Sequence, residues 1–319
     1  MRDSDLSRSP VERIVASREK IMKQTGGLAP TLGIAIHNGI LMSLGTLETI
    51  AGTVPDGCGS EVVDIIATGC RNQWARVEQA LAAAAAAAGV SGHAAPATDT
   101  AIDAFLIHVG RPWQAFPAAM AKAVTAIQGG AGGPEGLATR MILMDLILQL
   151  KIAMLNLKVL RIVRTPMAVS AKTVDLTRIF EEAQKVDRYH SHRQVRLHGD
   201  PVKVIGSSAH IHYCVNELIR NALRFSPYGS PVTLATFAEG RHLGIYVDDQ
   251  GAGFGKLGID QAILPFRRSD RSLDVGTECR LGLGLANIAS LAKKFAWSLE
   301  FIATGHGERP VLILPAAIS

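Results

Sequence analysis

The spacing of apolar and polar residues divides the chain into two parts near residue 165. In the first part apolar residues recur at the spacing of an amphipathic helix, and stretches rich in Gly, Pro and Ser interrupt the pattern. The helices predicted in this way cover about residues 9–24, 29–51, 59–89, 98–109, 114–128 and 135–164. Residues 1–165 are therefore predicted to form an all-α bundle or hairpin.

The second part mixes short alternating stretches with helical ones. Residues 231–251 alternate as expected for a hairpin of two strands with a Gly-containing turn. Further short β-rich runs and three amphipathic helices accompany it, the helices at about residues 172–186, 207–225 and 282–295. Residues 172–319 are therefore predicted to be an α/β sandwich with helices on one face of a mixed sheet, and the whole chain is of the α+β class.

Composition and charge narrow the classes of function. The chain is 48% apolar and 19% charged, which is typical of a globular protein. Its net charge of +5 is not concentrated in a Lys/Arg run, so we expect no nucleic-acid partner. The four cysteines lie far apart without a CxxC pair, which fits a reducing compartment and argues against a zinc or disulfide framework.

The most apolar stretch, residues 141–163, does not have the pattern of a membrane span. Charged residues recur along it, at Asp145, Lys151, Lys158 and Arg161. The N-terminal sequence is polar and charged, unlike a signal peptide. We expect a soluble, cytoplasmic protein without membrane insertion.

The sequence NELIRNALRFSP, residues 216–227, carries the first candidate chemistry. Its apolar residues follow helical spacing, and Pro227 ends the helix. Glu217 and Asn221 are four residues apart and therefore lie on one stripe of that helix. The pair is either a solvated polar edge or a carboxylate and a carboxamide that face a ligand.

Two glycine-containing stretches follow. In DDQGAGF, residues 248–254, Asp249 comes at a strand end and is followed by Gly251 and Gly253, so a ligand can approach the backbone closely. The overlapping GFGKLG matches the dinucleotide-binding pattern, but it does not lie between a strand and a long helix of a βαβ unit.

The second glycine-containing stretch is RLGLGLANIASLAKKF, residues 280–295. Gly282 and Gly284 open an amphipathic helix there, and free backbone N–H groups at a helix start form an anion site. The polar residues 264–279 between the two stretches have the length of a lid.

In order and spacing, these three stretches resemble the N, G1 and G2 boxes of the Bergerat-type ATP-binding domain. Sensor histidine kinases share that domain with gyrase, the heat-shock chaperones and the mitochondrial dehydrogenase kinases. PFRRSDRS, residues 265–272, resembles the F box of the kinases. The resemblance covers about residues 172–315.

The resemblance implies a role for each matching residue. Asn221 would coordinate Mg²⁺, Asp249 would accept a hydrogen bond from the adenine amino group, and Glu217 stands where the hydrolysing members have their general base. Arg224 replaces the usual lysine near the phosphates, which keeps the charge and changes the geometry. The implied ATP–Mg²⁺ site consists of Asn221, Asp249, Gly251, Gly253, Gly282 and Gly284.

The sequence departs from the kinase pattern at three places. Arg280-Leu281 replaces the first Gly-Thr of the G2 box. KKFAWSLEF lacks the glycine pair that usually precedes the next strand, and GHGERPVLILP lacks the threonine expected after its last glycine.

The resemblance also implies a phosphoacceptor histidine on the first helix of a hairpin. His37, in the apolar residues 28–50, is the best candidate. The family supplies a Glu or Asp next to the histidine as the base, and this chain has Asn38 instead. The alternative is a histidine that packs on a helix without chemistry.

Taken together, the leading hypothesis is an ATP-binding, histidine-kinase-like signalling protein. It would autophosphorylate on His37, pass the phosphate to a response-regulator receiver domain, and form a homodimer through its N-terminal half. The helical segment at about residues 51–134 is an insertion or part of an enlarged bundle. Two alternatives are a phosphotransfer or adaptor protein with a partly degenerate ATPase domain, and a serine kinase that resembles the dehydrogenase kinases.

Overall fold

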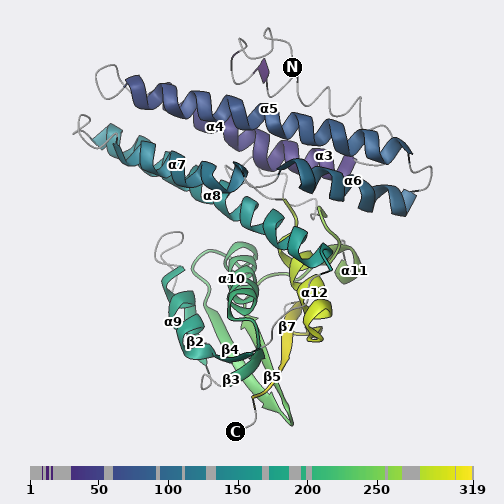
Figure 1. The fold of residues 1–319 in the computed structure, drawn as a ribbon. Coiled ribbons are helices and arrows are strands. Elements are labelled where there is room, and N and C mark those ends of the chain that lie inside the picture. The colour runs from purple at the N-terminus through teal and green to yellow at the C-terminus, as the bar shows by residue number, and fades with distance from the viewer. Residues whose placement is uncertain are drawn as a thin grey trace. The chain divides into compact units, whose positions relative to one another are not determined.

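The computed structural model of the chain describes most of its length. The described residues are 9, 12–13, 16, 30–53, 60–90, 94–109, 112–126, 134–166, 172–186, 195–198, 203–255, 258–267, 281–305 and 307–317. They form two compact units, one within residues 1–161 and the other made of residues 162–273 and 282–319 (Figure 1). Each unit is described by itself.

The first unit is helical. Its described elements are α3 (Pro30–Ile36), the π-helical turn η1 (His37–Leu41), α4 (Met42–Ala51), α5 (Ser60–Val90), α6 (Ala94–Val109), α7 (Pro112–Ala126) and α8 (Pro134–Arg164), the last of which runs into the second unit. The described part of this unit contains no strand, which confirms the all-α prediction. The predicted helix at 9–24 lies mostly outside the described residues.

Apolar side chains from α3, η1 and α4 form the centre of this unit. Ile36, Ile40, Leu44 and Leu47 are fully buried, and α4 packs against α5. The alanine-rich end of α5 packs along α6, where Ala80 and Ala84 occupy little space. In the described residues one stretch, Leu32–Ala51, is long and apolar enough to span a membrane, yet 61% of it is buried in the protein, as in a soluble core helix.

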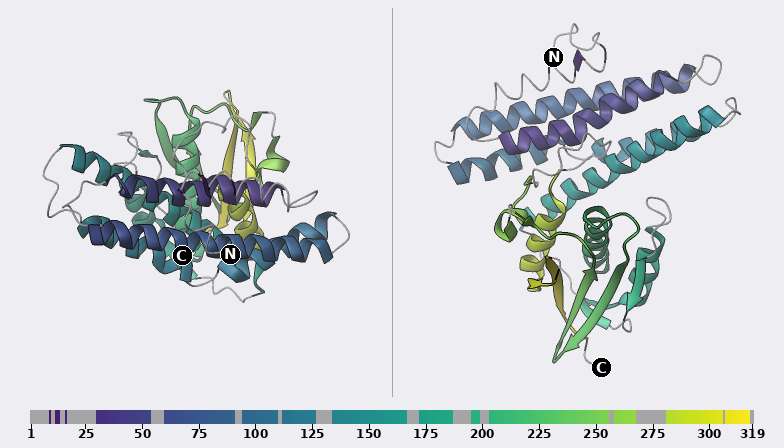
Figure 2. Two further views of the ribbon diagram at one scale, coloured as in Figure 1. Left: turned by 90° about the horizontal axis from the view of Figure 1, so that it is seen from above. Right: turned by 180° about the vertical axis from the view of Figure 1, so that it is seen from behind.

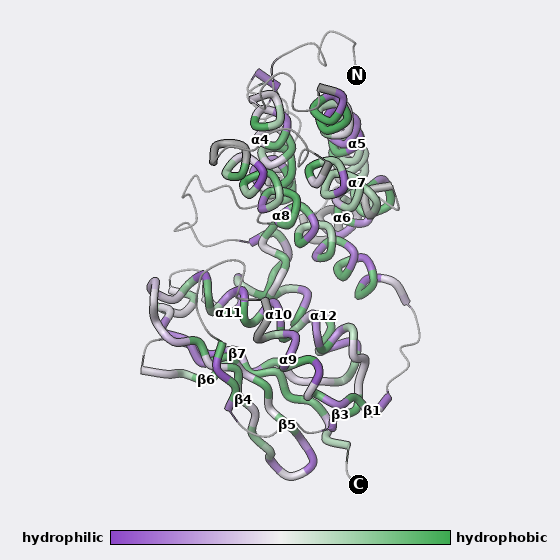
Figure 3. Tube along the Cα trace, turned by 90° about the vertical axis from the view of Figure 1, so that its left-hand side faces the viewer, coloured by the Kyte–Doolittle hydropathy of each residue, from purple (hydrophilic) through white to green (hydrophobic). Residues whose placement is uncertain are grey.

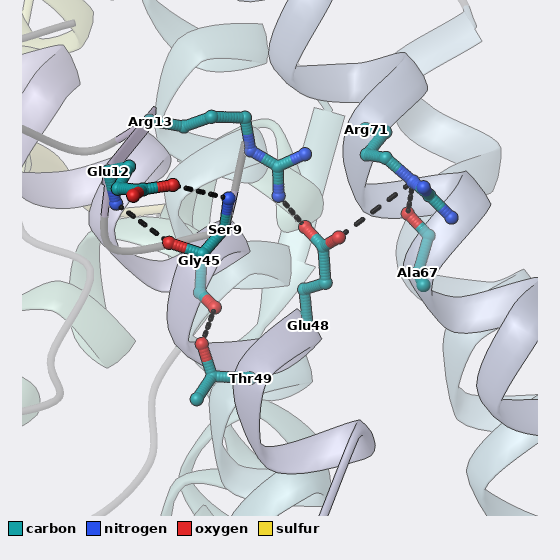
Figure 4. A network of polar contacts seen from close by, with 8 residues as sticks. All are labelled: Ser9, Glu12, Arg13, Gly45, Glu48, Thr49, Ala67 and Arg71. Atoms are coloured by element: carbon teal, nitrogen blue, oxygen red, sulfur yellow. Dashed lines mark hydrogen bonds and ion pairs between the residues drawn. The ribbon is translucent and has the colours of Figure 1, made fainter. Parts of the chain in front are cut away.

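A polar network ties α4 to the N-terminal residues and to α5 (Figure 4). Glu48 forms an ion pair with Arg13, and its other oxygen lies 3.8 Å from Nε of Arg71. Arg13 is 4% exposed and its guanidinium lies 5.6 Å from the ring centroid of Trp74. Burial, reinforced by the charge of Glu48, raises the pKa of the Cys70 thiol, so Cys70 stays protonated.

The second unit is built on a mixed five-stranded sheet of order β2-β4-β5-β7-β6. β2 runs parallel to β4, and the other pairs are antiparallel. A separate antiparallel pair consists of β1 and β3. The strands are β1 (Lys172–Asp175), β2 (Val195–His198), β3 (Lys203–Gly206), β4 (Val232–Glu239), β5 (His242–Asp248), β6 (Ser298–Ala303) and β7 (Glu308–Pro315).

Helices cover one face of this sheet (Figures 2 and 3). They are α9 (Leu176–Val186), α10 (Ser208–Phe225) and α12 (Gly284–Phe295), and a short α11 (Gly258–Ala262) follows β5. The α/β sandwich and the β4–β5 hairpin are therefore as predicted.

The helix predicted at 172–186 is wrong at its start, because residues 172–175 form β1 and pair with β3. Thr173 and Val174 are β-branched and favour a strand. Asp175 then accepts a hydrogen bond from the Thr177 amide, at 2.9 Å, and starts α9 at Leu176.

The last turn of α8, which belongs to the second unit, is bonded to the end of α12. The Lys294 ammonium donates hydrogen bonds to the carbonyl oxygens of Ile162 and Thr165, at 3.1 and 2.7 Å. The last carbonyls of a helix lack partners within the helix and carry partial negative charge, so a cation stabilises them.

Candidate functional site

The helix α10 carries a buried carboxylate on its polar stripe. Glu217 is 5% exposed and forms an ion pair with Arg220, so it does not lie on a solvated edge. Burial raises the pKa values of Tyr213 and Cys214, and the charge of Glu217 raises both further. Asn221, one turn after Glu217, is half-buried.

The carboxylate of Glu217 lies against the first residue of α12. A Cβ atom on Gly284 would overlap Oε2 of Glu217, so a residue with a side chain does not fit there without displacing the carboxylate. Gly282, just before the helix, has φ 65°, which favours glycine. The structure therefore brings Glu217 of the first motif together with the glycine-rich start of α12.

The end of α10 is hydrogen-bonded to the loop after β5. Oδ1 of Asp249 accepts hydrogen bonds from the Gly251 amide at 2.6 Å and from the Ser226 hydroxyl at 3.3 Å. Oγ of Ser226 in turn accepts one from the Gln250 amide at 3.2 Å. A Cβ on Gly251 would lie 2.7 Å from that Asp249 oxygen, so the tight loop requires glycine.

Sequence reasoning treated Ser226 only as the residue that ends a helix. Its hydroxyl joins two of the motifs, and the sequence signal for it is a Ser at the C-terminal cap of α10.

The rest of the loop after β5 packs on the turn between β6 and β7. Gly253 has φ 65°, and a Cβ on Gly307 would lie 2.6 Å from the Gly253 nitrogen. Glu308 stands where the kinase pattern has a threonine, and its Oε2 accepts a hydrogen bond from the Phe254 amide at 3.2 Å. Although Glu308 differs from the threonine of the kinase pattern, it therefore makes a polar contact with the loop after β5.

The described part of the lid segment is anchored next to α12. Phe266 is 3% exposed, and its amide donates a hydrogen bond to the Gly282 carbonyl oxygen at 3.0 Å. The kinase-like F box thus begins with a buried aromatic ring next to the glycines. Residues 268–280, including Arg280, lie outside the described residues.

Comparison with known proteins agrees with this geometry. Residues 206–318 match the family described as histidine kinase-, DNA gyrase B-, and HSP90-like ATPase. These residues are an ATPase domain of that family. The resemblance inferred from the N, G1 and G2 boxes is therefore confirmed for this part of the chain.

Two solved histidine kinase structures are similar to part of this chain. The mycobacterial sensor histidine kinase MprB is 23% identical, with a TM-score of 0.40, over 46% of this chain and 98% of that one. The Acinetobacter baumannii histidine kinase AdeS is 16% identical, with a TM-score of 0.40, over 63% of this chain and 96% of that one.

A further solved structure matches this chain with a TM-score above 0.5. Full-length ShkA in complex with AMPPNP is 15% identical, with a TM-score of 0.51, over 68% of this chain. The match spans 46% of the length of ShkA, and at this identity it shows the fold alone. No curated protein matches the chain significantly.

Arg224 lies at the exposed end of α10 in the ATPase domain. Its guanidinium lies 5.5 Å from the ring centroid of Phe225, which is itself exposed, as is Tyr228 in the following turn. The structure thus places this cation on the surface beside the exposed Phe225 ring.

His37 lies in the helical unit and is the first residue of the π-helical turn. It is 3% exposed, and its Nδ1 lies 3.1 Å from Oδ1 of Asn38. The donor and acceptor roles in this contact depend on which ring nitrogen carries the proton. Within the described ranges no group of three or more His, Cys, Asp or Glu residues is arranged to hold a metal ion.

Proposed function

We propose that this protein binds ATP–Mg²⁺ in its ATPase domain and acts as a histidine-kinase-like signalling enzyme. The observation that carries the proposal is the meeting of three motifs in one domain. Glu217 of α10 contacts Gly284 of α12, and Ser226 of α10 is hydrogen-bonded to Asp249 after β5.

The polar groups around these contacts have the hydrogen-bonding character needed to bind the adenine and the phosphates of a nucleotide. The Asp249 carboxylate is held by the hydrogen bonds that it accepts from Gly251 and Ser226. This orients it to accept a hydrogen bond from the adenine amino group. The glycine-rich start of α12 offers backbone N–H groups to the phosphates.

Asn221 supplies the kind of oxygen ligand that Mg²⁺ takes in nucleotide sites, and the residue is half-buried rather than fully buried. Bound Mg²⁺ would neutralise charge that develops on the phosphates during transfer.

The acceptor in this proposal is His37. Nε2 of His37 would form a bond to the γ-phosphorus while the bond from that phosphorus to the bridging oxygen breaks, and ADP leaves with the electron pair. In the tautomer whose Nδ1–H donates to Oδ1 of Asn38, Nε2 would be the nucleophile. Since His37 is buried here, its exposure must precede transfer. A receiver domain of a response regulator would then take the phosphate in the cytoplasm.

We further propose that the protein is a homodimer through its helical unit. The helix α8 has exposed apolar side chains at helical spacing, Leu137, Met141, Met144 and Leu155. A soluble protein covers such a stripe by association. A monomer measured by light scattering at micromolar concentration contradicts this part of the proposal.

Incubation of the full chain with γ-labelled ATP tests the acceptor. We expect label that is lost in acid, is stable in alkali, and is absent from His37→Gln. Asn38→Asp should increase the rate about 100-fold, because a carboxylate beside the imidazole can take its proton.

Acid-stable label instead identifies a serine kinase. An unlabelled protein that still binds ATP identifies an adaptor, a function favoured by the burial of His37.

A further inference from the structure

The carboxylate of Glu217 is engaged on both of its oxygens. Oε1 accepts a hydrogen bond from Nη2 of Arg220, three residues further along α10. Oε2 lies against Gly284. The Glu217 side chain is 6% exposed and the Arg220 side chain 25%, so little water competes with the ion pair. The carboxylate is therefore fixed in direction, and its charge is compensated.

Arg220 lies on a polar stripe of α10. It follows His212 and Asn216 at intervals of four residues, and Nδ2 of Asn216 lies 3.1 Å from Nε2 of His212. The buried Nε of Arg220 has no hydrogen-bond partner among the described residues. A buried donor without a partner destabilises the folded state. We infer that the ion pair with Glu217 stabilises this position of Arg220 by more than that cost.

The position of Glu217 in the ATPase family is that of a base that activates water. A carboxylate acts as a base only when an oxygen lone pair is directed at the proton that it takes. In this chain one oxygen is bonded to a guanidinium that stays charged, and the other faces a helix start. The same carboxylate can therefore support the glycine backbone while it leaves water unactivated.

We propose that Arg220 is a specificity-determining positioning residue, which keeps Glu217 from activating water and so directs the phosphoryl group of ATP to a side chain. This inference rests on the proposed function. Arg220 acts through Glu217, and its removal changes the acceptor that the domain can use.

The suppressed reaction is the hydrolysis of ATP. The oxygen of water forms a bond to the γ-phosphorus, and the bond from that phosphorus to the bridging oxygen breaks. The proton of water passes to Glu217, and ADP leaves with the electron pair on its terminal oxygen. The products are ADP and inorganic phosphate, so no further reactant is needed.

The test is phosphate release from ATP by the full chain and by Arg220→Met, Arg220→Lys, Glu217→Gln and the double variant Glu217→Gln/Arg220→Met. We expect Arg220→Met to raise kcat at least about tenfold. This is less than the full rate increase that a positioned general base provides. KM should stay within about threefold, because the change acts on the chemical step. Arg220→Lys keeps a cation and a donor and should stay near the wild type.

The double variant decides the role of Glu217. Phosphate release should return to the wild-type rate, because the freed carboxylate is then gone. An increase that persists in the double variant overturns the inference, as does an Arg220→Met variant that binds ATP without faster release. If Arg220→Met does not fold, as seen by circular dichroism, Arg220→Gln carries the same expectation.

Calorimetry with the wild type and a non-hydrolysable ATP analogue distinguishes a failure of the proposed function from a failure of the role proposed for Arg220. Failure of the wild type to bind overturns the proposed function and this inference with it. Binding without the expected change in hydrolysis overturns the inference alone.

Discussion

Each unit of this protein contains a carboxylate paired with an arginine, and the two pairs differ in what else they touch. In the helical unit Glu48 pairs with Arg13, which is 35 residues away in the sequence, and also approaches Arg71 of α5. In the ATPase domain Glu217 pairs with Arg220 of the same helix, and its second oxygen faces a glycine of another helix.

The difference suits a structural role for Glu48 and the functional role that we propose for Glu217. Glu48 joins segments that are distant in sequence, so its partners account for both of its oxygens and for its burial. Glu217 gains only a local contact from Arg220, and its remaining neighbour is backbone without a side chain. A buried charge beside open glycine backbone is the arrangement that a ligand can use.

The largest effect is expected from Asn221→Ala, which removes the carboxamide of the nucleotide site. Affinity for ATP–Mg²⁺ should fall at least about 100-fold, because a metal-supported phosphate contact is lost. Calorimetry measures the affinity, and the unfolding temperature should change little. The matched control is Asn72→Ala on the exposed face of α5, which should bind as the wild type does.

The next largest effect is expected from Glu48→Gln, which leaves Arg13 buried without its counter-charge. The free energy of unfolding should fall by about 3 kcal/mol, the cost of breaking a buried pair from one side. Urea denaturation measures the loss, and nucleotide affinity should be unchanged. Equal losses of stability and of affinity would remove the distinction between the two carboxylates.

A smaller effect is expected from Gly284→Ala, whose Cβ would overlap Oε2 of Glu217. We expect a loss of about 1–3 kcal/mol in the free energy of unfolding, as for other overpacked sites. Glu217→Ser should relieve it, so that the two changes are not additive. Gly305→Ala is the control, since a Cβ there meets no atom within 4 Å.

The smallest effect is expected from Lys294→Met, which removes the two hydrogen bonds to the last turn of α8. The free energy of unfolding should fall by about 1 kcal/mol.

The same change should alter how stability depends on pH. Burial, and then the charge of Lys294, lowers the folded-state pKa of His210 below the ordinary histidine value of 6.5. The folded state therefore binds fewer protons, and stability is lost as the pH falls below about 6.5. In Lys294→Met this loss should be shallower, as measured by urea denaturation at several pH values.

Much of this architecture follows from short-range patterns in the sequence. Helical spacing of apolar residues predicts the elements of the helical unit, because burial of one face determines a helix. The glycines and the Asp249 loop are predictable as well, since their backbone conformations exclude most side chains.

Contacts between distant segments could not be predicted in the same way. The hydrogen bonds of Ser226 and Glu308, and the anchoring of Phe266 at Gly282, depend on how the sheet brings loops together. The pairing of β1 with β3 overrides a helical pattern for the same reason. The π-helical turn at His37 has no sequence pattern of its own, because it arises from packing on both sides.

That turn affects the direction in which the side chains around it point from the helix axis. A π turn holds one residue more than an α turn, and successive residues differ by about 100° around the helix axis. If the π turn moved past His37, the imidazole would rotate around the helix axis by the angle between two successive residues. Both ends of the helix would stay packed. One position is the difference between buried His37 and exposed Asn38. Such a shift would turn the imidazole from a buried position towards an exposed one.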